Sequence, residues 1–259
     1  MVHTRRPQQR WPEGRLAIDP RWIARGLKSF YLLRKDCWAI NLVTAKVGGA
    51  TVGTGLTFPN GWAKTPGSVD NGATLQHGLA VDISLPFTIV AGWVQSSGTV
   101  SWSLLDNTTL WTGWYGQGAG TVRATNSNSF DGSIDLASQN AAFAHVAANN
   151  LRGSGGLGTI VDTTVAAPSS VSPTTVALGW ARRDTGDNAA VATFTHFGAF
   201  QGALTDAELQ ELAAYPMRLL KPQRIFVPMQ AASSGLPTLT ALTASNITTS
   251  GWRATLTAA

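Results

Sequence analysis

The stretch Ala192-Thr-Phe-Thr-His-Phe-Gly-Ala-Phe-Gln-Gly-Ala-Leu-Thr-Asp-Ala-Glu-Leu-Gln-Glu-Leu212 decides the fold, because a strand pattern changes into a helix pattern within it. Alternate residues from Phe194 through His196 to Phe200 share one face of a period-2 run. We therefore predict a strand whose aromatic face packs inward. The leucines that follow fit one side of a short helix near residues 205–214.

The start of this helix has its own sequence signals. Thr205 is followed three residues later by Glu208, the spacing of a capping box in which each side chain satisfies a backbone N–H of the first turn. Leu204 and Leu209 flank that cap at the positions of a hydrophobic staple. A strand that runs directly into a capped two-turn helix is therefore predicted.

Composition favours many short strands elsewhere in the chain. Only 13% of the 259 residues are charged, while 27 are glycine and 12 are proline. Alternating or apolar runs predict strands over residues 38–43, 50–58, 87–94, 99–105, 110–115, 121–125, 141–148 and 175–180. The run 87–94 is almost entirely apolar, so we expect cover on both faces, with a neighbouring subunit on one of them.

Two segments resemble a known fold family. Phe197–Leu212 resembles the closing "R-x-L-[ST]-x-x-E-[IL]-x-x-L" segment of laminin-G-like, concanavalin A-like jelly rolls. Phe87–Val94 is similar to their central "F-T-[IL]-x-x-W-[VI]" strand. The resemblance implies an all-β, two-sheet antiparallel jelly-roll sandwich over residues 36–229, with one short C-terminal helix and an extended N-terminal arm.

Further segments resemble proteins of tailed bacteriophages. Arg15–Leu27 and Ala214–Pro222 are similar to segments before and after such jelly rolls in phage virion proteins. This implies a non-enzymatic structural protein, a tail fibre or tail-associated appendage, located in the virion. A capsid decoration protein and a carbohydrate-binding adhesion module are the alternatives. Residues 230–259 combine a linker with a segment that resembles the start of a fibronectin type III module.

Positive charge is concentrated at the N-terminus. The net charge is +5, and nine of the nineteen cations fall within residues 1–35 among aromatic and apolar residues. We predict that residues 1–35 form a basic arm that docks on an acidic surface of other virion proteins, rather than on nucleic acid. The candidate docking residues are Arg5, Arg6, Arg10, Trp11, Arg15, Arg21, Trp22 and Arg25. Repetitive assembly would make the protein a homo-oligomer.

Catalytic and cofactor chemistry finds little support in the sequence. The Glu-x-Asp-x-Glu arrangement of related glucanases is missing, and the pairs Asp131/Asp135 and Asp184/Asp187 fit turns better. We predict no catalytic residue, no cofactor and no metal ligand, with Ca²⁺ as the alternative at the loop oxygen donors Asp106, Asn107, Asp184, Asp187 and Asn188. His145 and His196 lie in predicted strands and fit core or interface positions.

Two tryptophans are candidate contacts for a host-surface glycan. Trp111 and Trp114 could stack on sugar rings, although three residues of separation place them on opposite faces of a regular strand. A bulge at Gly113 would bring them together. The longest apolar runs are shorter than eighteen residues and the N-terminus lacks an apolar segment, so neither membrane insertion nor a secretory signal is expected.

Overall fold

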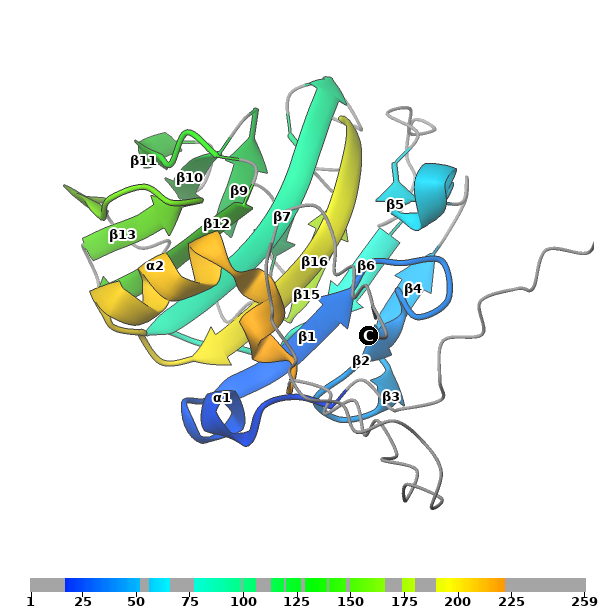
Figure 1. Cartoon of the computed structure of the whole chain (residues 1–259). Helices are drawn as coiled ribbons and strands as arrows, with labels where there is room; N and C mark the ends of the chain where they lie inside the picture. The colour runs from blue at the N-terminus through cyan, green and yellow to red at the C-terminus, as the bar shows by residue number, and fades with distance from the viewer. Residues whose placement is uncertain are drawn as a thin grey trace, which may run out of the picture. The chain divides into compact units, whose positions relative to one another are not determined.

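In the computed structural model, the first of two structural units lies within residues 1–222 (Figure 1). The described residues are 17–51, 56–65, 77–98, 100–105, 113–118, 120–126, 129–138, 140–147, 150–165, 174–179 and 190–221. Residues 223–259 form the second unit. The predicted linker and fibronectin-like segment fall there and lie outside the described residues.

Two antiparallel sheets make up the described unit, which confirms the predicted all-β sandwich. The helix-covered sheet contains, in order, β1 (Leu27–Leu32), β16 (Val191–Gln201), β7 (Phe87–Ser97), β12 (Asn140–Ala147), β13 (Asn150–Gly155) and β14 (Val161–Thr164), with β5 (Ala63–Lys64) also pairing with β16. The opposite sheet contains β11 (Ser129–Asp135), β10 (Thr121–Asn126), β9 (Gly113–Gln117), β8 (Trp102–Leu105), β15 (Thr175–Leu178), β6 (His77–Ala80) and β4 (Gly49–Thr51). A small ladder joins β2 (Ile40–Asn41) to β3 (Lys46–Val47), and η1 (Pro59–Gly61) precedes β5.

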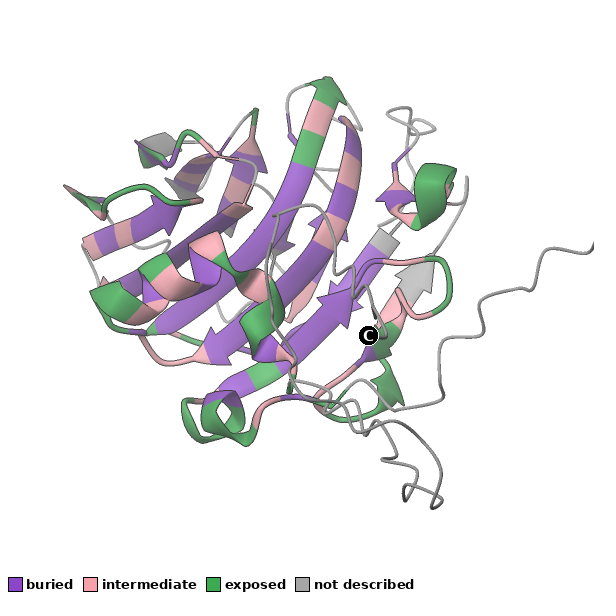
Figure 2. Ribbon diagram, viewed as in Figure 1, coloured by how far each residue is buried: buried purple, intermediate pink, exposed green. Residues whose placement is uncertain are grey.

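The core between the sheets is aromatic. Phe87, Ile89 and Trp93 of β7 alternate into it. The ring of Phe87 meets the indole of Trp114 on the opposite sheet edge-to-face, with 4.7 Å between ring centroids. Figure 2 shows this buried interior along β7, β12 and β16.

The face pattern of β16 differs from the sequence prediction. Its register against β7 shifts between Phe194 and His196, where a bulge inserts one residue. Phe194 lies before the bulge and faces the inter-sheet core. Because the bulge adds one residue, Phe197 and Ala199 after it face the same core. Beyond the bulge, Phe200 packs in the cluster on the other face of the sheet.

A helical layer covers that other face of the helix-covered sheet. α1 (Pro20–Ala24), α2 (Asp206–Ala214) and η2 (Pro216–Leu219) lie over it (Figure 1). Val90 of β7 packs there with Leu209 and Leu212 of α2. The expected cover by a neighbouring subunit is thus replaced by the chain's own helices. None of the described helices is long and apolar enough to cross a membrane.

The helix signals are confirmed at atomic level. The Thr205 hydroxyl accepts a hydrogen bond from the Glu208 N–H, and the Glu208 carboxylate accepts one from the Thr205 N–H at 2.9 Å. Asp19 caps α1 by accepting from the Arg21 N–H at 2.9 Å. Gly26 follows α1 with a φ of 93°, a left-handed conformation that glycine adopts without strain.

The N-terminal boundary differs from the predicted arm of residues 1–35. β1 pairs with β16 along Leu27–Leu32, so residues 17–35 belong to the sandwich and its helical layer. The strand predicted over residues 38–43 contains only the short β2 among turns. Residues 1–16 lie outside the described part of the chain.

Candidate functional site

Trp22, a predicted docking residue, contacts its own chain instead. It is completely buried, and its indole N–H donates to the Arg218 carbonyl at 2.9 Å. Its ring meets Phe200 edge-to-face. Trp22 therefore joins α1 to η2 and β16, and it presents no surface to a partner. Arg5, Arg6, Arg10, Trp11 and Arg15 lie outside the described residues.

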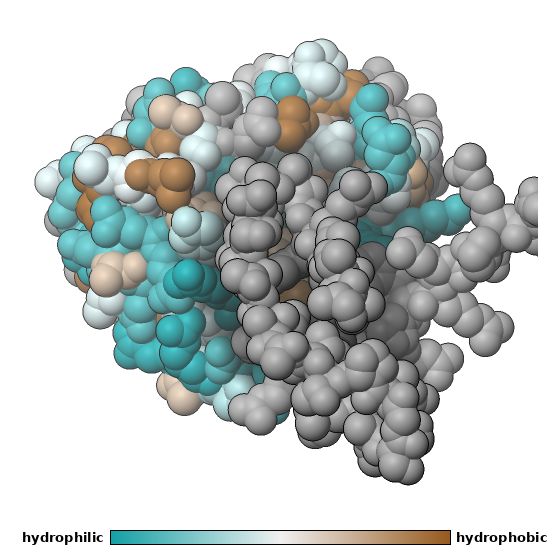
Figure 3. Space-filling view, in the orientation of Figure 1, coloured by the Kyte–Doolittle hydropathy of each residue, from teal (hydrophilic) through white to brown (hydrophobic). Residues whose placement is uncertain are grey.

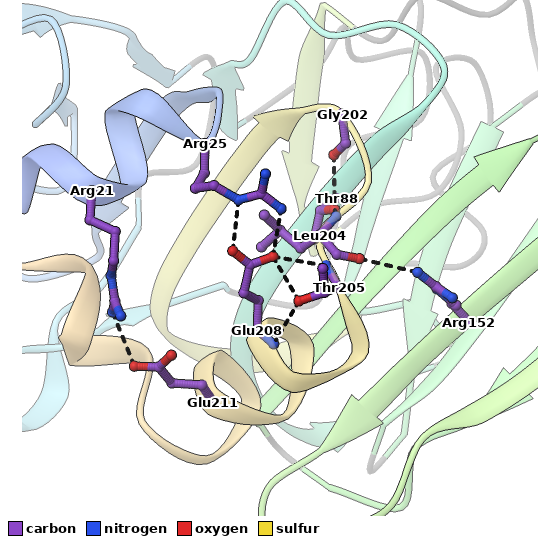
Figure 4. Close-up of polar contacts among 9 residues, drawn as sticks. All are labelled: Arg21, Arg25, Thr88, Arg152, Gly202, Leu204, Thr205, Glu208 and Glu211. Carbon is purple, nitrogen blue, oxygen red and sulfur yellow. Dashed lines mark hydrogen bonds and ion pairs between the residues drawn. The ribbon is translucent and has the colours of Figure 1, made fainter.

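The two predicted docking arginines on the described chain hold α2. Arg25 donates to both carboxylate oxygens of Glu208, each at 2.7 Å, and Arg21 donates to Glu211 at 3.0 Å (Figure 4). The hydrogen bonds from Arg25 lower the pKa of Glu208 to about 2 and raise the pKa of Arg25. In sequence these cations appear as an unpaired run, because their partners follow more than 180 residues later.

A polar network fixes the loop that leads into α2 (Figure 4). The Thr88 hydroxyl accepts from the Leu204 N–H at 3.0 Å and donates to the Gly202 carbonyl at 3.0 Å. Arg152 on β13 donates to the Leu204 carbonyl at 3.3 Å and pairs with Asp206 at 3.1 Å. The start of α2 is therefore fastened to β7, β13 and α1 at once.

Trp114, a predicted glycan contact, lies in the core. It is fully buried, and its indole N–H donates to Nδ1 of His145 at 2.9 Å. A side chain in this position cannot stack on a sugar in solvent. Trp111 lies outside the described residues.

Both strand histidines are buried core residues, as predicted. Nδ1 of His196 lies 2.9 Å from the Thr195 hydroxyl. Burial lowers the pKa of His196 to about 3, so the ring is neutral at physiological pH.

The predicted acidic turn residues are only partly described. Asp135 ends β11 and accepts from the Ala137 N–H at 2.9 Å, which is a turn-forming contact, whereas Asp131 lies within β11 rather than in a loop. The other loop oxygen donors, Asp106, Asn107, Asp184, Asp187 and Asn188, lie outside the described residues. Within the described ranges, no group of three His, Cys, Asp or Glu side chains could hold a metal ion.

A surface that the sequence analysis missed lies where α1 meets η2. We call it the α1–η2 patch; it consists of Arg21, Tyr215, Met217 and Arg218. Its apolar side chains are 42–52% exposed, whereas most large apolar side chains among the described residues are buried. The Arg218 guanidinium lies 4.7 Å from the centre of the Tyr215 ring. Much of the visible surface around α1 and α2 is hydrophilic (Figure 3).

Beside this patch, the first and last described residues, Ala17 and Lys221, lie next to each other. The Lys221 N–H donates to the Ala17 carbonyl at 2.7 Å, and Ile18 forms an antiparallel bridge with Leu220. The Asp19 N–H also donates to the Leu219 carbonyl at 2.9 Å. Residues 17–19 and 219–221 therefore lie side by side.

No family model and no curated protein matches this chain. Domain 4 of AbnA, a GH43 extracellular arabinanase from Geobacillus stearothermophilus, is similar in structure with 15% identity and a TM-score of 0.48, over 73% of this chain and 98% of that one. The binding domain of botulinum neurotoxin DC has 12% identity and a TM-score of 0.45, over 74% of this chain and 52% of that one. The CBM40 of Ruminococcus gnavus IT-sialidase has 19% identity and a TM-score of 0.36, over 56% and 96%. At these scores, the likenesses assign neither family nor function.

Proposed function

We propose that this protein is a non-catalytic module that binds carbohydrate through the α1–η2 patch. The observation that supports it is the half-exposed Tyr215 ring beside the exposed guanidinium of Arg218, which shares the Glu211 carboxylate with the exposed Arg21. Aromatic rings pack against the C–H faces of sugars, while a few fixed polar groups orient the ligand. The ion pairs and the buried Trp22 hold this surface in place, which reduces the entropy lost on binding.

The roles of Glu208 and Glu211 support binding rather than hydrolysis. A glycosidase needs two carboxyl groups across the scissile bond, one of them protonated because its pKa is raised. Here the pKa of Glu208 is lowered to about 2, and Glu211 is held by Arg21 and Arg218. Both described glutamates therefore stabilise the helical layer.

The test is a glycan array probed with the full chain, followed by titration of the retained glycans. We expect Tyr215→Ala to abolish retention while the melting temperature stays close to that of the parent, because the ring is half exposed. The matched control is Trp111→Ala, which should retain binding. An array without retained glycans, or binding lost only in Trp111→Ala, would reject this site.

A tailed-phage appendage is the second candidate function, as a setting in which such a module is displayed. It is supported by the phage-like segments Arg15–Leu27 and Ala214–Pro222, which meet at the paired ends of the domain. A domain attached at one point suits display from a tail fibre or tail-associated structure, with capsid decoration as the alternative location. Antibodies raised against the protein should label tailed particles released by a strain that carries the gene; unlabelled particles would reject virion location.

A further inference from the structure

We propose that the α1–η2 patch selects sugars that bear a carboxylate, and that Arg21 and Arg218 recognise this group. The inference rests on the proposed carbohydrate-binding function and names the ligand class of the same site. It starts from the ion pairs at the junction of α1, α2 and η2.

Two arginines share one carboxylate oxygen at this junction. Oε1 of Glu211 accepts from Arg21 at 3.0 Å and from Arg218 at 3.1 Å. Two positive charges and one negative charge leave this group with a net charge of +1. A second carboxylate would balance it.

In the neighbouring Arg25–Glu208 pair, the positive and negative charges cancel. Arg25 and Glu208 form a one-to-one pair in which both carboxylate oxygens accept from the same guanidinium. This pair already joins α1 to α2. The group around Glu211 adds a second cation at the same interface, and the carboxylate of a bound ligand would balance its charge.

The two guanidiniums are oriented and accessible. Arg21 lies 4.2 Å from the centre of the Trp22 ring, and Arg218 lies 4.7 Å from that of Tyr215. Their side chains are 50% and 56% exposed. Each donates to Glu211 through one terminal nitrogen, whereas a guanidinium has five N–H donors in a planar fork that fits a carboxylate.

The apolar members of the patch favour a sugar acid over a simple anion. Tyr215 and Met217 are 52% and 42% exposed. An inorganic anion gains nothing from these surfaces, whereas a pyranose ring presents C–H groups to them. The chemistry of the patch therefore matches a sugar ring with a carboxylate.

The test compares two sugars that differ only in this group. Methyl β-D-glucuronide and methyl β-D-glucoside are titrated into the full-length protein, and dissociation constants are obtained from NMR chemical shifts. We expect the glucuronide to bind at least about tenfold more tightly, since hydrogen bonds between charged groups exceed neutral ones by that much. Equal affinity for the two sugars would overturn the inference and leave the proposed function intact.

Matched variants locate the selectivity. Arg21→Gln and Arg218→Gln should each reduce the glucuronide preference toward unity, whereas Arg34→Gln, which removes a different arginine–carboxylate pair, should preserve it. Tyr215→Ala should weaken both sugars alike. Thermal melting verifies that each variant is folded. If Arg218→Gln does not fold, Arg218→Lys replaces it as the test variant. Lysine keeps the positive charge but lacks the planar fork of donors, so part of the glucuronide preference should be lost.

Two further outcomes would overturn the inference. Sodium sulfate that competes as well as the glucuronide would make the patch a general anion site. A preference that persists in both arginine variants would place recognition elsewhere. If neither sugar binds and the glycan array is also empty, the proposed function fails together with the inference.

Discussion

At the scale of single residues, Trp114 and Tyr215 show how burial changes the meaning of an aromatic side chain. Trp114 is enclosed between the sheets with its N–H donated to His145, whereas the Tyr215 ring is 52% exposed beside Arg218. Both types of ring can stack on a sugar. Only the exposed one is available to do so.

Trp114→Ala should therefore lower the free energy of unfolding by about 3–5 kcal/mol, because it opens a large cavity in the core. Urea denaturation measures the change. Trp62→Ala, at a partly exposed position, is the control and should cost less. Native stability in Trp114→Ala would contradict the described core.

His196 predicts a pH dependence of stability. Its pKa is about 3 in the folded protein, while the unfolded chain binds a proton near pH 6.5. As pH falls below 6.5, only the unfolded state gains this proton, so the free energy of unfolding decreases by up to about 1.4 kcal/mol per pH unit. The loss ends near pH 3. Between pH 6.5 and 4.5, His196→Gln should show a flatter dependence in urea titrations; an unchanged slope would contradict this assignment.

At the scale of elements, α1 and α2 depend on each other although they lie at opposite ends of the domain sequence. α2 is defined locally by its capping box, but α1 has only five residues and is too short to be stable alone. The burial of Trp22 and the Arg25–Glu208 pair supply what α1 lacks. The N-terminal segment from residue 17 is thus a structural part of the domain.

Trp22→Ala tests this dependence. We expect a loss of about 3–5 kcal/mol in unfolding free energy, because the side chain is fully buried. Ile23→Ala, on the exposed side of the same helix, should change it by less than about 0.5 kcal/mol. If residues 1–35 were a free arm, neither change would affect unfolding.

Thr205→Ala tests the start of α2. Loss of the cap should cost about 1 kcal/mol, and Thr205→Ser, which keeps the hydroxyl, should restore most of it. Differential scanning calorimetry measures both variants. Equal melting temperatures for the alanine and serine variants would show that the capping hydrogen bond adds no stability.

At the scale of the whole molecule, the first and last residues of the described domain lie together. Ala17 and Lys221 are joined by a backbone hydrogen bond, so the two ends of the described unit coincide. The α1–η2 patch lies next to these paired ends.

A circular permutant tests this closure. A short Gly/Ser linker from residue 221 to residue 17, with new ends at the exposed Leu157 turn, should yield a folded protein with a cooperative melt. The control permutant, opened between Val90 and Ala91 in the central strand β7, should fail to fold. Failure of the first permutant would contradict the adjacency of the ends.

Sequence alone determined the features that depend on neighbours a few residues apart. The apolar run 87–94 predicted the strand β7, and the spacing of Thr205 and Glu208 predicted the start of α2. The limits of α1 have local causes too, because Asp19 caps it, Pro20 begins it and Gly26 follows it in a left-handed conformation. Periodicity and capping depend on residues that are close together in the chain, so the sequence indicates them directly.

Only the tertiary structure decided the features that join distant residues. The bulge in β16 depends on its pairing with β7, and this pairing turns Phe197 toward the core against simple alternation. The partners of Arg21 and Arg25 follow more than 180 residues later, and the α1–η2 patch exists only once α1 meets η2. The sequence shows which residues are charged or apolar. Which of these residues are buried, paired or exposed depends on contacts that form only when the chain folds.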